Sequence, residues 1–150
     1  MEKKRKIIPP VYLMMTLAFM WLFNRYFPLY QALNPPLAYG GIIAVLMGIG
    51  MAAISAGMFR KAGTGIEPFD DATTLVTAGF YRITRNPMYL GMFMMLFGVA
   101  FLLGSIGALI PMPVFVLIIR NNFVLGEERF LEAVFGHSYL AYKSEVRRWI

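Results

Sequence analysis

The sequence contains no cysteine and a single histidine, His137. Without cysteine the chain can form no disulfide, no thiolate metal site and no cysteine nucleophile, and one histidine cannot hold a metal by itself. We therefore expect no metal, and we interpret His137 as a structural residue at a membrane interface. The chain also lacks a Walker loop and the motifs G-x-G-x-x-G, G-x-S-x-G and H-E-x-x-H. These absences argue against hydrolysis, nucleoside triphosphate use and a dinucleotide-binding domain.

Charge is missing from two long stretches of the chain. No Asp, Glu, Lys or Arg occurs between Arg25 and Arg60 or between Arg85 and Arg120, a gap of 34 residues each time. The apolar fraction is 59% and the mean hydropathy is +0.62, whereas soluble domains are about 45–50% apolar. A membrane span needs about 20 apolar residues. The 150 residues are therefore predicted to form one all-α domain, a polytopic membrane bundle of about four transmembrane helices with a C-terminal amphipathic helix.

The predicted spans cover residues 7–27, 37–59, 87–103 and 108–125. Residues 28–36 and 104–107 are expected to be turns, 60–86 a polar segment, and 127–150 an amphipathic helix and tail. The basic start, Met1–Lys6, has no cleavage site after it, so we expect a retained first helix. Pro111 and Pro113 are expected to interrupt the fourth span. Five glycines predict close helix packing in the second: Gly40, Gly41, Gly48, Gly50 and Gly57.

The net charge of +6 does not indicate nucleic-acid binding, because the basic residues lie at the ends of the apolar stretches. Of the 14 Lys and Arg residues, Arg25 alone falls near the opposite side of a four-span bundle. The positive-inside rule then places both termini and the polar segment in the cytoplasm. We expect an integral protein of the cell or inner membrane.

Two polar clusters flank the apolar hairpin at residues 87–125. The first runs from Thr73 to Tyr89 and the second is Glu127-Glu128. Each residue has an ordinary explanation: threonines cap helices, Arg and Tyr anchor helices at interfaces, and Glu favours a helix start. A helix N-terminus beside Arg85 is also a site for an anionic group, and ionisable residues at membrane depth are candidates for function.

The two clusters together resemble the isoprenylcysteine carboxyl methyltransferases and the related phospholipid methyltransferases. The resemblance rests on four segments, which cover about residues 62–149: Leu75-Val76-Thr77-Ala78-Gly79-Phe80-Tyr81, Arg85-Asn86-Pro87-Met88-Tyr89, Glu127-Glu128-Arg129-Phe130-Leu131, and Phe135-Gly136-His137-Ser138-Tyr139-Leu140-Ala141-Tyr142. Two positions depart from the family pattern. Asn86 stands where the eukaryotic enzymes have His, and Phe123 stands where prenylcysteine enzymes have a substrate-binding Arg. Arg120, one helical turn earlier, is the candidate that replaces that Arg.

The resemblance implies an integral membrane methyltransferase that uses S-adenosyl-L-methionine. Carried over by position, the cofactor-binding residues are Thr73, Thr74, Leu75, Val76, Tyr81, Asn86, Pro87, Met88, Tyr89 and Glu127. Glu127 and Arg85 are the candidates for direct roles in catalysis. The implied acceptor is a lipophilic small molecule or lipid with a carboxylate, thiol or amine, and an amine could pass its proton to Glu127 or Glu128.

Two other functions remain open at this point. Sterol reductases share the C-terminal architecture of the family but bind a nicotinamide cofactor and have more spans. A non-enzymatic membrane protein could use the polar segment to bind a partner. Neither alternative accounts for both polar clusters, so the methyltransferase is the leading hypothesis.

Overall fold

The computed structural model describes residues 8–65 and 72–150. The N-terminal basic patch and residues 66–71 of the predicted polar segment lie outside this range. Within it, the chain is helical and forms no named strand, with one isolated bridge between Gln31 and Ser105. The long helices are α1 (Pro9–Tyr26), α2 (Gly40–Lys61), α3 (Pro87–Leu103) and α4 (Pro111–Ile119), and α5 (Leu125–Phe135) and α6 (His137–Glu145) follow. The all-α prediction is confirmed for the described residues.

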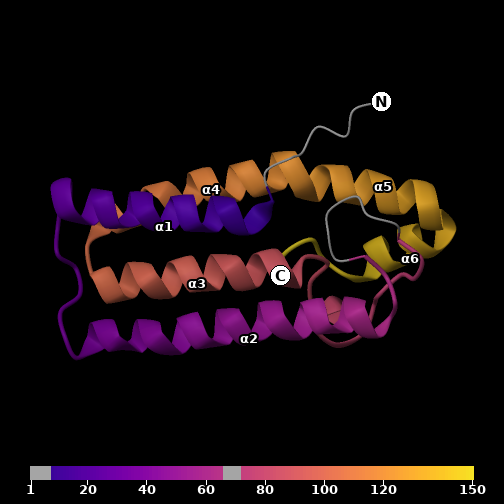
Figure 1. The fold of residues 1–150 in the computed structure, drawn as a ribbon, viewed down its shortest axis with the longest axis horizontal. Coiled ribbons are helices and arrows are strands. Elements are labelled where there is room, and N and C mark those ends of the chain that lie inside the picture. The colour runs from indigo at the N-terminus through magenta and orange to yellow at the C-terminus, as the bar shows by residue number, and fades with distance from the viewer. Residues whose placement is uncertain (1–7, 66–71) are drawn as a thin grey trace.

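Successive long helices run in opposite directions, and α3 lies between α2 on one side and α1 with α4 on the other (Figure 1). Short 3-10 helices precede α2 (η1, Leu37–Tyr39), α3 (η2, Gly79–Arg82) and α4 (η3, Ile106–Leu109). Two continuous helices are long and apolar enough to cross a membrane, Leu37–Lys61 with 25 residues and Ile106–Phe135 with 30. Helix α3 has 17 residues and is shorter. Four membrane crossings therefore stay a prediction, while the apolar helices agree with a membrane protein.

Glycines bring α2 and α3 together. A Cβ atom on Gly48 would lie 2.5 Å from the carbonyl oxygen of Gly91, and one on Gly41 would collide with that of Gly98. The two glycines on each helix are seven residues apart, so they recur on one face at the crossing. The prediction of a packing helix is right for these two positions. At the other three glycines of α2, an added Cβ would meet no neighbouring atom of the described residues within 4 Å: Gly40, Gly50 and Gly57.

The last apolar span differs from the prediction. Pro111 is the first residue of α4 and Pro113 lies in its first turn, where a missing backbone N–H costs nothing, so neither proline interrupts the helix. Helix α4 continues through a π-helical turn, η4 (Arg120–Val124), into α5 without a break. The prediction of a single amphipathic helix after Glu127 is wrong. Gly136, with a φ of +50°, ends α5, and a separate helix, α6, begins at His137.

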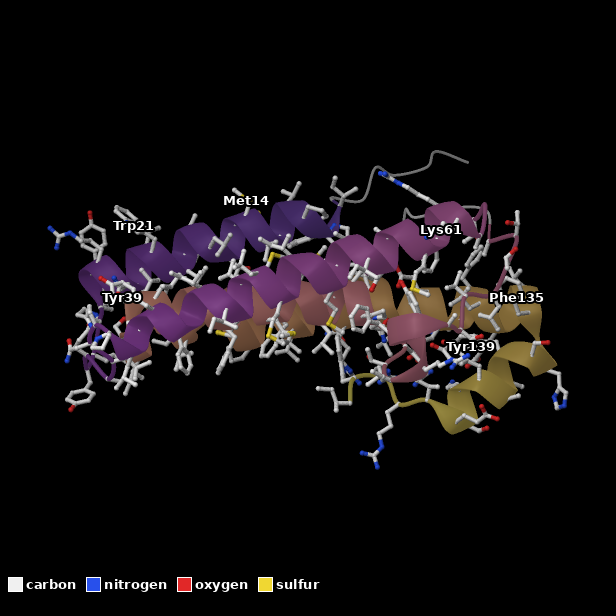
Figure 2. The ribbon with its side chains drawn as sticks, turned by 90° about the horizontal axis from the view of Figure 1, so that it is seen from below. Met14, Trp21, Tyr39, Lys61, Phe135 and Tyr139 are labelled. Carbon is white, nitrogen blue, oxygen red and sulfur yellow. The ribbon has the colours of Figure 1, made fainter. Side chains whose placement is uncertain are left out.

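The polar groups gather at one end of the bundle. Figure 2 shows Lys61, Phe135 and Tyr139 at this end, while Trp21 and Tyr39 lie at the opposite end. Residues 146–150 follow α6 as a segment without helix or strand, called the C-terminal strap below, and Figure 1 shows its end beside the start of α3. The N-terminal end of α3, the start of α5 and this strap thus meet in one region.

Candidate active site

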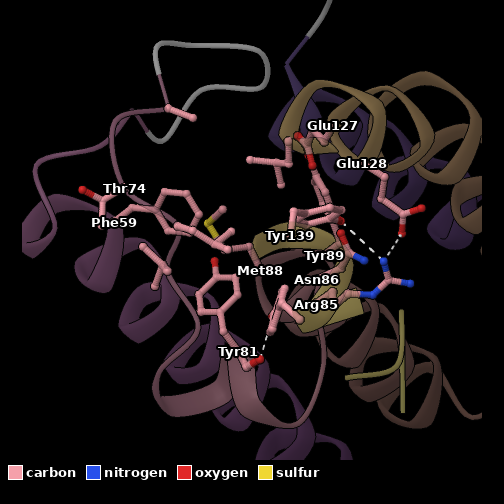
Figure 3. Close-up of a pocket in the computed structure, with 15 residues that line it drawn as sticks. Phe59, Thr74, Tyr81, Arg85, Asn86, Met88, Tyr89, Glu127, Glu128 and Tyr139 are labelled. Carbon is pink, nitrogen blue, oxygen red and sulfur yellow. Dashed lines mark hydrogen bonds and ion pairs between the residues drawn. The ribbon is translucent and has the colours of Figure 1, made fainter. Parts of the chain in front are cut away.

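A cavity of about 80 Å³ lies at this end of the bundle (Figure 3). Its walls are mostly apolar, but residues of both polar clusters line it, and for that reason we call it the polar cavity. Its walls come from the end of α2, the loop before η2, the start of α3, α5 and α6. Its lining residues are Phe59, Ala72, Thr74, Leu75, Val76, Tyr81, Arg85, Asn86, Met88, Tyr89, Glu127, Glu128, Leu131, Tyr139 and Tyr142. Both polar clusters of the sequence therefore contribute to one cavity.

Tyr89 and Glu127 join the two clusters directly. Tyr89 lies in the first turn of α3, where Pro87 starts the helix, and its hydroxyl donates a hydrogen bond of 2.6 Å to Glu127 Oε1. Glu127 follows the π turn closely. A π turn holds one residue more than an α turn, and one residue rotates the following helix face by about 100°. The turn therefore decides which residues of α5 face α3.

Tyr81 supplies the opposite wall of the cavity. The residue is 4% exposed, its ring lies 5.3 Å from that of Phe59, and its backbone oxygen accepts a 2.6 Å hydrogen bond from the Tyr142 hydroxyl. Its own hydroxyl has no partner among the described residues and points toward the side of the cavity where Phe59 and Met88 lie (Figure 3). Burial raises the pKa of Tyr81, so the hydroxyl stays protonated and can donate to a ligand.

The neighbouring carboxylate, Glu128, has a different environment. It accepts two hydrogen bonds of 2.8 Å from Arg148 Nε and Nη2, and Arg85 Nη1 lies 3.2 Å from its Oε1. Arg85 also donates to the Tyr139 hydroxyl at 3.4 Å (Figure 3). The hydrogen bonds to Glu128 raise the pKa of Arg148. Two cations thus neutralise Glu128, and the anion beside Arg85 is a carboxylate of the protein itself.

By contrast, no cation pairs with Glu127 in residues 8–65 and 72–150. Its partner there is the neutral hydroxyl of Tyr89. Of the two carboxylates, Glu127 is therefore the one that can meet a positive charge or a proton on a ligand.

Asn86 holds the C-terminal strap. Its side-chain amide donates to the backbone oxygen of Arg148 at 3.0 Å, and the Thr84 hydroxyl donates to the same oxygen at 3.0 Å. The backbone N–H of Arg85 donates to Arg147 O at 3.0 Å. Asn86 borders the cavity, yet its amide nitrogen is engaged in this contact.

Nine of the predicted site residues line the cavity: Thr74, Leu75, Val76, Tyr81, Arg85, Asn86, Met88, Tyr89 and Glu127. Three others do not. The Thr73 hydroxyl donates to Gly63 O at 3.1 Å, Pro87 is buried as the first residue of α3, and Arg120 donates to Asn121 Oδ1 at 3.2 Å on its own helix. Phe123 is 2% exposed and packs 6.4 Å from the Tyr89 ring, inside the core.

The residue that sequence reasoning missed is Arg148. Its pairing with Glu128 joins residues 20 positions apart and depends on the helix break at Gly136. No local sequence pattern predicts that pairing. Tyr139 and Tyr142 were visible in the sequence as a spaced tyrosine motif, but their contacts with Arg85 and Tyr81 were not. No group of three or more potential metal ligands occurs in the described part of the chain.

Comparisons with known proteins identify the family of the chain. The family model of the phospholipid methyltransferases matches residues 37–138, more than half of the chain, and this range includes Tyr89, Glu127 and Glu128. An uncharacterized protein of Haemophilus influenzae is 36% identical over 63 residues, which are 42% of this chain and 100% of that protein. No solved structure matches the chain. The chain therefore belongs to the phospholipid methyltransferase family, a family of membrane methyltransferases.

Proposed function

We propose that the protein is an S-adenosyl-L-methionine-dependent methyltransferase that modifies a lipophilic small molecule or lipid at the cytoplasmic face of the membrane. The observation that carries this proposal is the Tyr89–Glu127 pair, 2.6 Å long, on the wall of a cavity in a chain of this family.

The chemistry of the cavity suits the cofactor. S-adenosyl-L-methionine has an adenine ring, a sulfonium and an amino acid end, and it supplies an electrophilic methyl group when bound. Phe59 and Tyr81 offer aromatic surface for a flat ring, and the Tyr81 hydroxyl, unpartnered within the described residues, offers a hydrogen bond donor. Glu127 offers the charge that an ammonium or sulfonium requires.

Glu127 has two tasks in this proposal. Its carboxylate holds a positively charged group of the cofactor, and Tyr89 fixes its orientation through the hydrogen bond to Oε1. Where the acceptor is an amine, the same carboxylate is placed to take up the proton that the amine loses. Glu128 has no direct task in this proposal, because Arg85 and Arg148 already compensate its charge. Orientation of two bound molecules then supplies most of the acceleration.

The cavity must widen when the cofactor binds. Its volume of about 80 Å³ is well below the roughly 300–1,000 Å³ of ligand pockets. In the described residues, the loop that carries Thr74 is held by the contacts of Thr73 with Thr64 and Gly63, and Leu75 and Val76 pack against the core cluster of Tyr81, Tyr139 and Tyr142. We propose that the part around Thr74, which belongs to no helix, moves outward when the cofactor enters, as active-site loops commonly do.

Isothermal titration with S-adenosylhomocysteine tests the proposal on the detergent-solubilised protein. We expect binding by the wild type and an affinity at least about tenfold lower in Glu127→Gln, because a charged hydrogen bond is worth about 1.5–3 kcal/mol. Glu132→Gln is the matched control, since that carboxylate lies on the same helix but pairs with Lys143 at the surface. Binding of NADPH without binding of S-adenosylhomocysteine would favour a reductase. Equal affinities in wild type and Glu127→Gln would refute the assigned role.

A further inference from the structure

A second cavity lies on the other side of Tyr89. It has a volume of about 350 Å³ and is lined by Tyr89, Leu90, Phe93, Phe115, Val116, Ile119, Trp149 and Ile150. We call it the apolar groove. It lies within the volume range of about 300–1,000 Å³ that is usual for ligand pockets, and it is several times larger than the polar cavity.

The lining of the apolar groove specifies what can occupy it. Seven of its eight lining side chains are hydrocarbon or indole, none of the eight is charged, and Tyr89 is the residue shared with the polar cavity. The Tyr89 hydroxyl is bonded to Glu127, so the polar part of this residue marks the end of the groove nearest the proposed chemistry. A ligand that fits both regions has an uncharged hydrophobic body and one reactive head group.

The C-terminal strap forms one wall of the groove. Trp149 and Ile150 belong to the strap and are placed by the contacts of the preceding residue, Arg148. Arg148 is fixed by its side chain on Glu128 and by its backbone oxygen, which accepts from Thr84 and Asn86. The same residue thereby ties the wall of the apolar groove to the polar cavity.

We propose that the apolar groove binds the hydrocarbon body of the methyl acceptor, a lipid with one slender chain or ring system, and that Trp149 is a specificity-determining wall of this site. The proposal rests on the proposed function and adds the acceptor's binding site and class to it. The acceptor enters from the membrane side between α3 and α4, and its head group reaches the Tyr89–Glu127 pair. The cofactor occupies the opposite side of Tyr89.

Photolabelling with a diazirine-bearing fatty alcohol tests this proposal on the full chain in phosphatidylcholine nanodiscs. We expect labelled peptides to map to Phe93, Val116 and Trp149, which line the groove. Val116→Trp adds bulk inside the groove and should reduce the labelling of Phe93 and Trp149 about tenfold, the factor that a steric penalty of about 1.4 kcal/mol produces. Val114→Trp is the matched control, because Val114 lies on the same helix, is 55% exposed and lines neither cavity. We expect it to label like the wild type.

A second variant guards against misfolding of the first. Trp149→Ala removes the wall without adding bulk, and it should reduce labelling of Phe93 and Val116 by several-fold. Labelling spread evenly over exposed residues of α2 such as Leu46, or labelling unchanged in both groove variants, would overturn the proposal, as would crosslinks between two copies of the chain. Titration of the same samples with S-adenosylhomocysteine distinguishes a failure of the groove proposal from a failure of the proposed function. Binding with diffuse labelling refutes the groove alone, and absence of binding by the wild type refutes the proposed function.

Discussion

The link between Arg148 and Glu128 predicts how firmly the C-terminal strap is held. The pair consists of two charge-assisted hydrogen bonds of 2.8 Å, with Glu128 8% exposed and Arg148 30% exposed at their side chains. Arg148→Ala removes these bonds but leaves Glu128 paired with Arg85 at 3.2 Å. The cost should therefore be about 2 kcal/mol, the value of charged hydrogen bonds, and not the roughly 3–5 kcal/mol of an orphaned buried charge.

Hydrogen exchange can measure this cost locally. The backbone N–H of Arg85 donates to Arg147 O at 3.0 Å, so its exchange reports opening of the strap. A loss of about 2 kcal/mol should accelerate this exchange about 30-fold in Arg148→Ala, while the amides inside α3 keep their wild-type rates. Exchange is followed by mass spectrometry on the peptide that contains Arg85.

Lys143→Ala provides the control for this experiment. Lys143 pairs with Glu132 at the surface, where the side chains are 37% and 34% exposed, so its removal should cost about 0–1 kcal/mol and change the exchange by less than about fivefold. The reasoning is refuted if the Arg85 amide exchanges at the wild-type rate in Arg148→Ala, or if Lys143→Ala accelerates it equally.

Two further predictions concern the site and the bundle. Tyr81→Phe removes a buried hydroxyl that has no partner in the described part of the chain, so thermal unfolding of the ligand-free protein should show a gain of about 1 kcal/mol while titration shows weaker S-adenosylhomocysteine binding. If Tyr81→Phe lowered both the thermal stability and the affinity for S-adenosylhomocysteine, the hydroxyl would be a structural group, and its assigned role as a donor to the ligand would be contradicted. Gly48→Ala places a Cβ 2.5 Å from the oxygen of Gly91 and should destabilise the bundle by about 1–3 kcal/mol. Gly50→Ala, which meets open space among the described residues, should be neutral or stabilising, and equal effects of the two would refute the packing argument.

The sequence was sufficient to predict features that depend on local patterns. The gaps without charge gave the positions of α2 and α3 to within a few residues, and Pro87 gave the start of α3. Gly79 has a φ of +57°, a backbone conformation that glycine adopts readily, so the turn before α3 is compatible with its local sequence. The meeting of Tyr89 with Glu127 was also predictable, because a short hairpin between two apolar helices returns the second polar cluster to the first.

Features that depend on distant contacts escaped prediction. The pairing of Arg148 with Glu128 requires a break in the helix at Gly136 and a non-helical tail after α6, and neither follows from helical periodicity. The bond from the Asn86 amide nitrogen to the strap was not predicted, and Asn86 also lines the cavity to which the resemblance assigned it. The glycines of α2 were equivalent in the sequence. Only the position of α3 distinguishes Gly41 and Gly48, which pack, from those with open space beside them in the described structure.

The two adjacent glutamates show how a helix gives neighbouring residues separate roles. Consecutive residues of an α-helix point about 100° apart, so Glu127 and Glu128 cannot share one set of partners. The π turn ending at Val124 fixes the rotation of α5, which directs Glu127 to Tyr89 and Glu128 to two arginines. Because Arg85 and Arg148 already compensate the charge of Glu128, that carboxylate is less available to a ligand. The half-buried carboxylate of Glu127, whose partner is the neutral Tyr89 hydroxyl, can still bind a cation or accept a proton. In the proposed function the catalytic task is therefore assigned to Glu127, because Glu128 is paired with Arg148 and so holds the strap that lines the proposed acceptor groove.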